Sequence, residues 1–100
     1  MADLARVRAH VRLSGRVQGV GFRDFVWRQA GRLGVAGFVR NLPDRGLEIV
    51  AEGTAGDVRA VIEAARIGPP GAIVHTVHVE WEAPRDERGF VIRSGGGIHD

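Results

Sequence analysis

Hydrophobic and polar residues alternate strictly over residues 6–14, near the start of the chain. One face of this segment carries only apolar side chains, and the other carries mainly arginines. Such alternation indicates a strand with one buried face. Related patterns predict four further strands, over residues 35–41, 47–52, 73–82 and 89–93.

Two other segments have the spacing of an amphipathic helix. Apolar side chains recur three and four positions apart over residues 22–33, and Gly34 follows them, where glycine commonly ends a helix. A second helix is predicted to begin after Thr54, whose spacing to Asp57 resembles a capping box, and to end at the Gly-Pro-Pro-Gly stretch of residues 68–71. The order of elements is therefore β-α-β-β-α-β, followed by one short strand.

This order predicts an α+β fold. The simplest arrangement is a ferredoxin-like sandwich, in which two helices cover one face of an antiparallel sheet and a short extra strand follows at the C-terminus. The length of 100 residues predicts a single domain over residues 1–100. Its core is expected over residues 6–93, and residues 94–100 are expected to form a mobile tail.

The amino-acid composition excludes several kinds of chemistry. The chain contains no cysteine, which rules out disulfide bonds, cysteine-ligated metals and thiol catalysis. Its 14 basic residues are all arginines, so the lysine of a Walker A phosphate loop is absent. The net charge of only +2 does not by itself indicate a nucleic-acid partner. No segment has the apolar length of a signal peptide or a membrane span, so we expect a cytoplasmic protein without membrane contact.

The predicted topology brings two distant segments together. In a split β-α-β arrangement, the strands over residues 6–14 and 35–41 run parallel, with another strand between them. Their carboxyl ends and the amino end of the first helix then share one edge of the sheet, with the two strands roughly 10 Å apart. We therefore expect residues 15–23 and Asn41 to face each other across a small cleft.

Three glycines occur in residues 15–21, which lead directly into the first helix. The N–H groups at a helix start are unpaired and partly positive, and glycines allow a loop to curl its own N–H groups around an anion. The spacing matches neither the dinucleotide-binding fingerprint nor the Walker A loop. A loop that only turns a tight corner is an equally good interpretation of the glycines alone.

Two polar residues at this predicted cleft are candidates for chemistry. Arg23 lies in the first helical turn, where a cation opposes the helix dipole by roughly 0.3–1 kcal/mol, and Arg16 adds a second positive charge. A bound phosphate would reverse this penalty; an arginine that is solvated or paired with a carboxylate is the alternative. Asn41 ends a strand before a turn, where asparagine is common for backbone reasons alone.

Two segments resemble the signature motifs of the acylphosphatase family. They are residues 15–23, Gly-Arg-Val-Gln-Gly-Val-Gly-Phe-Arg, and residues 37–41, Gly-Phe-Val-Arg-Asn. The resemblance extends in order over residues 6–93, and the family has the ferredoxin-like fold. One departure is the turn Asp44-Arg45-Gly46, where relatives often have Asp-Gly directly, so the type of this hairpin stays open.

The resemblance implies a hydrolase that splits small-molecule acyl phosphates into a carboxylate and inorganic phosphate, without a metal ion or organic cofactor. In the family, the arginine matched by Arg23 binds the phosphate together with backbone amides of the loop. The asparagine matched by Asn41 orients the attacking water. The loop residues implied are Arg16, Val17, Gln18, Gly19, Val20 and Gly21. We also expect a monomer.

Single features of the chain are compatible with other functions. Ferredoxin-like sheets also occur in RNA-recognition domains, and the arginine-rich face of residues 6–14 could contact RNA. Glu48 and Glu52 lie on the same predicted face and would repel phosphates, so we expect no nucleic-acid partner. An accessory role in a larger assembly is a second alternative. Trp27 and Trp81 are expected to pack in the core or to form the wall of a cleft.

Overall fold

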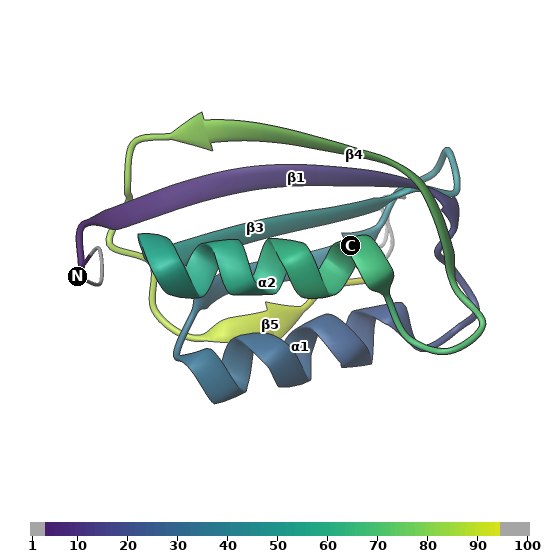
Figure 1. Cartoon of the computed structure of the whole chain (residues 1–100), viewed down its shortest axis with the longest axis horizontal. Helices are drawn as coiled ribbons and strands as arrows, with labels where there is room; N and C mark the ends of the chain where they lie inside the picture. Colours follow the sequence, from purple (N-terminus) through teal and green to yellow (C-terminus); the bar gives the residue numbers. More distant parts are fainter. Residues whose placement is uncertain (1–3, 95–100) are drawn as a thin grey trace.

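The computed structural model describes residues 4–94, and the predicted helices and strands occur there in the predicted order. The elements are β1 (Arg6–Arg16), α1 (Phe22–Leu33), β2 (Ala36–Asn41), β3 (Leu47–Thr54), α2 (Ala55–Ile67), β4 (Ile73–Glu82) and β5 (Phe90–Ile92). The strands form one sheet in the order β4-β1-β3-β2-β5, and both helices lie on the same face of it (Figure 1). The predicted ferredoxin-like sandwich is confirmed.

The edge of the sheet formed by β5 is not antiparallel. The pairs β1–β3, β1–β4 and β2–β3 are antiparallel, as expected. β5 instead runs parallel to β2. The sheet is therefore mixed at this edge, and the end of β5 lies next to the end of β2.

β1 continues two residues farther than predicted, to Arg16, through a bulge between Ser14 and Gly15. Gly15 has a φ of 123°, and a Cβ placed there would lie 2.2 Å from the carbonyl oxygen of Ile73. This glycine is required by the close approach of β1 to β4. The loop between β1 and α1 is consequently shorter than predicted and spans residues 17–21.

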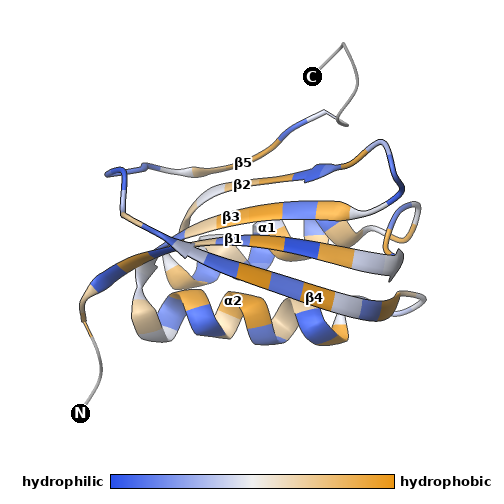
Figure 2. Cartoon of the chain, turned by 90° about the horizontal axis from the view of Figure 1, so that it is seen from above, coloured by the Kyte–Doolittle hydropathy of each residue, from blue (hydrophilic) through white to orange (hydrophobic). Residues whose placement is uncertain are grey.

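The core lies between the sheet and the two helices. Hydrophobic and hydrophilic residues alternate along the strands (Figure 2), so one face of each inner strand meets the helices. The largest fully buried apolar side chains are Phe22, Leu47, Ile49, Val11, Val17, Val26, Val39, Val58 and Val61. Burying a side chain of this size stabilises the fold by roughly 1.5–3 kcal/mol. This packing fixes the ends of β1, α1 and β2 relative to one another.

Of the two positions expected for the tryptophans, packing in the core or forming the wall of a cleft, the first is wrong for both. Trp27 is 47% exposed and Trp81 is 54% exposed. Trp27 lies on α1 outside its buried residues, Phe22, Val26 and Ala30. Trp81 lies on β4, an edge strand, where it lines a shallow hollow beside α2. The alternative expectation, the wall of a cleft, therefore fits Trp81.

A buried carboxylate holds the connection between β4 and β5 on the open face of the sheet. Glu52 of β3 has no exposed surface, and it accepts hydrogen bonds from the backbone N–H groups of Arg85 at 2.9 Å and Glu87 at 3.0 Å. Its carboxylate also forms salt bridges with Arg8 at 3.1 Å and Arg6 at 3.4 Å. Burial alone would raise the pKa of Glu52, but these donors outweigh it and lower the pKa to about 2. The connection that leads into β5 is thereby fastened to the sheet.

The predicted tail, residues 94–100, lies outside the described residues except for Ser94. Within residues 4–94, neither helix is long and apolar enough to cross a membrane. The expected cytoplasmic location and the boundaries of a single domain stay predictions.

Candidate active site

A cleft of about 260 Å³ lies where β1 and β2 end and α1 begins. It is lined by Val17, Gln18, Gly19, Gly21, Phe22, Arg23, Asp24, Asn41 and Ile92. The glycine-containing loop and Asn41 therefore do share one cleft. They come together because β3 lies between the parallel strands β1 and β2.

The loop that forms one wall of the cleft is shaped by two glycines. Gly19 has a φ of 72° and Gly21 a φ of 78°, while the space around both is open, so the backbone conformation and not crowding favours glycine there. Val17, at the start of the loop, is only 1% exposed because its side chain packs in the core. The loop is thus anchored at its first residue and turns sharply at its later ones.

The start of α1 has no side-chain cap, which leaves its first N–H groups available to an anion. Gly21 is the N-cap and has no side chain that could accept a hydrogen bond from the first turn. Its carbonyl oxygen accepts the first helical bond, from the Phe25 N–H at 3.0 Å. The first N–H groups of a helix have no partner within the helix and carry partial positive charge.

Arg23 is half-buried in the cleft and carries its positive charge there. Its Nη1 donates to the carbonyl oxygen of Arg93 at 3.4 Å. The adjacent Asp24 forms its ion pair with Arg28, at 2.9 Å. No carboxylate within residues 4–94 forms an ion pair with Arg23, which argues against the paired-arginine alternative.

Asn41 is the last residue of β2, and its carboxamide has no hydrogen-bond partner among the described residues. The following turn is closed by other groups: the Leu42 N–H donates to the carbonyl oxygen of Gly46 at 2.9 Å, and the Gly46 N–H donates to Asp44 Oδ1 at 2.9 Å. Arg45 takes the left-handed conformation, with a φ of 74°. The turn therefore forms without the Asn41 side chain, which weakens the interpretation of Asn41 as a turn former.

Gln18 connects the loop to this turn through its side chain. Its Nε2 donates to the carbonyl oxygens of Leu42 and Gly46, both at 2.9 Å. The motif resemblance implied only the backbone amide of Gln18. Sequence reasoning missed the side-chain contact because the two partners lie 24 and 28 positions away.

Two of the loop residues expected at the site do not line the cleft. Arg16 is exposed at the end of β1 and lines an adjoining hollow of about 530 Å³ together with Arg45; this hollow shares residues 17–19 with the cleft. Val20 packs against the core. Any contact of these two residues with a ligand in the cleft is expected through their backbone N–H groups.

Ile92 lines the cleft, and the carbonyl group of Arg93 reaches Arg23, although neither residue was expected there. They lie there because β5 pairs with β2. The pattern of so short a strand does not predict its pairing partner.

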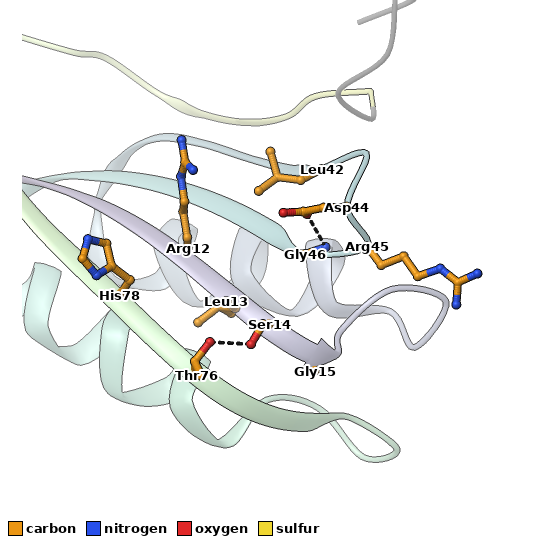
Figure 3. A pocket seen from close by; sticks show the side chains of 10 residues that line it. All are labelled: Arg12, Leu13, Ser14, Gly15, Leu42, Asp44, Arg45, Gly46, Thr76 and His78. Atoms are coloured by element: carbon orange, nitrogen blue, oxygen red, sulfur yellow. Dashed lines mark hydrogen bonds between the residues drawn. The ribbon is translucent and has the colours of Figure 1, made fainter.

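A neighbouring hollow of about 160 Å³ lies on the open face of the sheet (Figure 3). Figure 3 shows Arg12 and His78 rising from β1 and β4, and the Ser14 and Thr76 hydroxyls joined by a hydrogen bond. Neither Arg23 nor Asn41 lines this hollow. It is therefore distinct from the predicted site.

Several known proteins similar to this chain are acylphosphatases. The acylphosphatase family model matches residues 9–92. An acylphosphatase from Thermococcus kodakarensis is 53% identical over 89 residues, covering 89% of this chain and 98% of the relative. The crystal structure of acylphosphatase from Bacillus subtilis has a TM-score of 0.84 at 34% identity, covering 87% of this chain and 98% of that chain. The crystal structure of full-length HypF in the phosphate- and nucleotide-bound form also has a TM-score of 0.84, at 29% identity, covering 94% of this chain and 13% of that chain.

The matched residues include both motifs, residues 15–23 and 37–41, and so every part of the cleft wall contributed by β1, α1 and β2. The fold and the similarity to curated enzymes agree with each other. The chain therefore belongs to the acylphosphatase family and is an enzyme that hydrolyses acyl phosphates.

Proposed function

We propose that Arg23 and the backbone N–H groups of residues 16–21 bind the phosphate of the acyl phosphate, and that Asn41 orients the attacking water. The observation that carries this proposal is the position of Arg23. It stands in the first turn of a helix, without an acidic partner among the described residues, and in the same cleft as Asn41.

The cleft offers several hydrogen-bond donors for phosphate oxygens. The start of α1 and the turned loop supply N–H groups, and Arg23 supplies a planar guanidinium that can bind two oxygens at once. Arg23 now contacts a neutral carbonyl oxygen at 3.4 Å, a long hydrogen bond. A phosphate oxygen carries negative charge and can form a shorter bond with the guanidinium, so Arg23 gains electrostatic attraction when phosphate replaces the carbonyl oxygen as its partner.

The reaction demands little acid–base chemistry. Water attacks phosphorus, the bond between phosphorus and the acyl oxygen breaks, and the carboxylate leaves with that electron pair. A carboxylate is a stable leaving group, so no general acid is required. Catalysis then consists of holding the phosphoryl group, stabilising its charge and placing the water in line.

Asn41 fits the role of placing the water. Its carboxamide can both donate and accept hydrogen bonds but cannot take up a proton. The proton released by the water therefore goes to an oxygen of the substrate's own phosphate. Inorganic phosphate and the free carboxylate are the products.

The test is the release of phosphate from benzoyl phosphate by the purified chain in the presence of a chelator. We expect turnover with chelator, and a loss of at least about 100-fold in Arg23→Ala, the scale on which removing one charge-stabilising donor acts. Arg23→Lys should restore little, because lysine lacks the planar fork. Arg66→Ala is the matched control, since Arg66 is an exposed arginine of α2 that pairs with Glu63, and neither residue lines the cleft. Near-normal turnover in a folded Arg23→Ala protein would falsify the proposal.

A further inference from the structure

We propose that the side chain of Gln18 is a positioning residue: it holds the turn after β2, and with it Asn41, at a fixed distance from the phosphate-binding loop. This inference rests on the roles proposed above for Arg23 and Asn41. It assigns to Gln18 a task beyond its backbone N–H group, and it predicts an effect that passes through Asn41.

The contacts of Gln18 are specific for a carboxamide donor. Its NH₂ group has two hydrogens, and the two carbonyl oxygens of Leu42 and Gly46 each lie 2.9 Å away. These two carbonyl groups stand on opposite sides of the turn. The Leu42 N–H also donates to Gly46, so the pair closes the hairpin. The Gln18 side chain is therefore hydrogen-bonded to both the first and the last residue of the turn.

The turn has few other hydrogen bonds to the body of the protein. Its remaining bonds are internal, from the Arg45 N–H to Leu42 at 3.1 Å and from the Gly46 N–H to Asp44. In the described part of the chain, Gln18 is the only residue outside residues 42–46 that hydrogen-bonds to this turn. Without Gln18, its attachment would rest on the neighbouring strands and on the packing of Gly46 against the carbonyl oxygen of Leu13.

Asn41 directly precedes Leu42, so a shift of Leu42 also shifts the carboxamide in the cleft. Gln18 lies in the loop that lines the same cleft. Its side chain thus joins the part that binds phosphate to the part that orients water. A displacement of only about 1 Å in such an arrangement can lower the rate by on the order of 100-fold.

The first arm of the test compares turnover with phosphate affinity in Gln18→Ala. We expect kcat for benzoyl phosphate to fall at least about tenfold, while the dissociation constant for inorganic phosphate changes by less than about threefold, because ground-state binding is retained. Gln18→Met repeats the measurement with a side chain of similar volume and no donor, in case alanine impairs folding. Gln29→Ala is the matched control, since the Gln29 side chain accepts a hydrogen bond from Arg32 on α1 and does not line the cleft, so its loss should change neither quantity.

The second arm is a double-mutant cycle with Asn41→Ala. If Gln18 acts through Asn41, adding Gln18→Ala to Asn41→Ala should lower kcat by less than about twofold further, because coupled residues are not additive. If the kcat losses of the two single variants multiply in the double variant, the inference is overturned. It is also overturned if Gln18→Ala lowers phosphate affinity by as large a factor as kcat. An Asn41→Ala enzyme with full activity also overturns it, since nothing is then left for Gln18 to position. Failure of the phosphate site itself would be seen separately, as phosphate affinity unchanged by Arg23→Ala.

Discussion

Arg23, at the start of α1, donates a hydrogen bond to the carbonyl oxygen of Arg93, 70 positions later in the chain, at 3.4 Å. The backbone N–H of Arg93 donates to the carbonyl oxygen of Val39 on β2 at 2.9 Å. The guanidinium of Arg93 lies 3.9 Å from the centre of the Phe38 ring. The residue that follows β5, Arg93, is therefore attached to β2 through its backbone and its side chain. Its carbonyl oxygen in turn holds the guanidinium of Arg23 in the cleft.

Replacing Arg93 with alanine should weaken this support while keeping the carbonyl oxygen. The contact with Phe38 is worth roughly 0.5–1 kcal/mol at an exposed site, so the end of β5 should become looser. We expect kcat/KM for benzoyl phosphate to fall severalfold, far less than in Arg23→Ala. Steady-state kinetics measure this, with Arg88→Ala as the control because Arg88 is exposed just before β5. Equal values for Arg93→Ala and the wild-type chain would show that Arg23 does not depend on the Arg93 side chain.

Inorganic phosphate should raise the melting temperature of the chain. A ligand that binds only the folded state stabilises it by mass action, by about 2.7 kcal/mol at a concentration 100 times its dissociation constant. Sulfate, a similar anion, should act in the same direction. Thermal melts at increasing phosphate concentration measure the shift in the wild-type chain and in Arg23→Ala, where it should shrink. The same shift in both proteins would place the bound anion elsewhere.

Glu52 should make stability depend on pH below about 5. Its pKa is lowered from 4.5 to about 2, so the folded chain binds the proton less tightly than the unfolded chain. Its contribution to the free energy of unfolding is therefore complete above pH 4.5 and is lost as the pH falls toward 2. A lowering of this size corresponds to roughly 3 kcal/mol.

Glu52→Gln tests this. We expect a loss of roughly 3 kcal/mol at pH 7, since two buried backbone N–H groups and the guanidinium of Arg8 lose their charged acceptor. Arg8 keeps its ion pairs with Glu82 and Glu87. The gap to the wild-type chain should narrow between pH 5 and pH 3 in urea titrations. Glu63→Gln is the control, because Glu63 and Arg66 form an exposed pair that contributes less than about 1 kcal/mol. A gap independent of pH would mean that the Glu52 charge is not what stabilises the folded state.

The central part of the fold could be predicted from the sequence because the pattern of each long element is strong. Strict alternation over residues 6–14 and helical spacing over residues 22–33 leave little choice of element type. Topology then places Arg23 and Asn41 in one cleft before any family is considered. The edges were harder: β5 has three residues, and nothing in so short a pattern states which strand it pairs with or in which direction.

Contacts that depend on distant side chains could not be predicted. The sequence predicts Gln18 only as part of the glycine-containing loop, and its partners are main-chain carbonyl groups, which carry no sequence signature. The same holds for Arg93, which supports Arg23 through its own carbonyl oxygen. For Trp81 the sequence leaves open whether the side chain packs in the core or forms the wall of a cleft. The choice depends on how closely α2 approaches the edge strand β4, and Trp81 lines a hollow between them and stays 54% exposed.

Asn41 and Arg23 should be separable by kinetics. If Asn41 places the water without holding the phosphate, Asn41→Ala should lower kcat strongly while the affinity for inorganic phosphate stays almost unchanged. An interaction made mainly in the transition state lowers kcat and kcat/KM together, whereas lost ground-state binding raises KM. Arg23→Ala should instead weaken phosphate binding as well.

Asn41→Asp is the sharper variant. It keeps the size of the side chain but places a carboxylate in the cleft opposite an anionic substrate, so repulsion should weaken phosphate binding in addition to lowering kcat. A residue needed only to form the turn would tolerate the change, because aspartate also favours turns and Asp44 already accepts the hydrogen bond from Gly46. Steady-state kinetics and a phosphate titration of the two Asn41 variants therefore distinguish the roles. A fully active Asn41→Asp enzyme would reduce Asn41 to a structural residue and require another group to place the water.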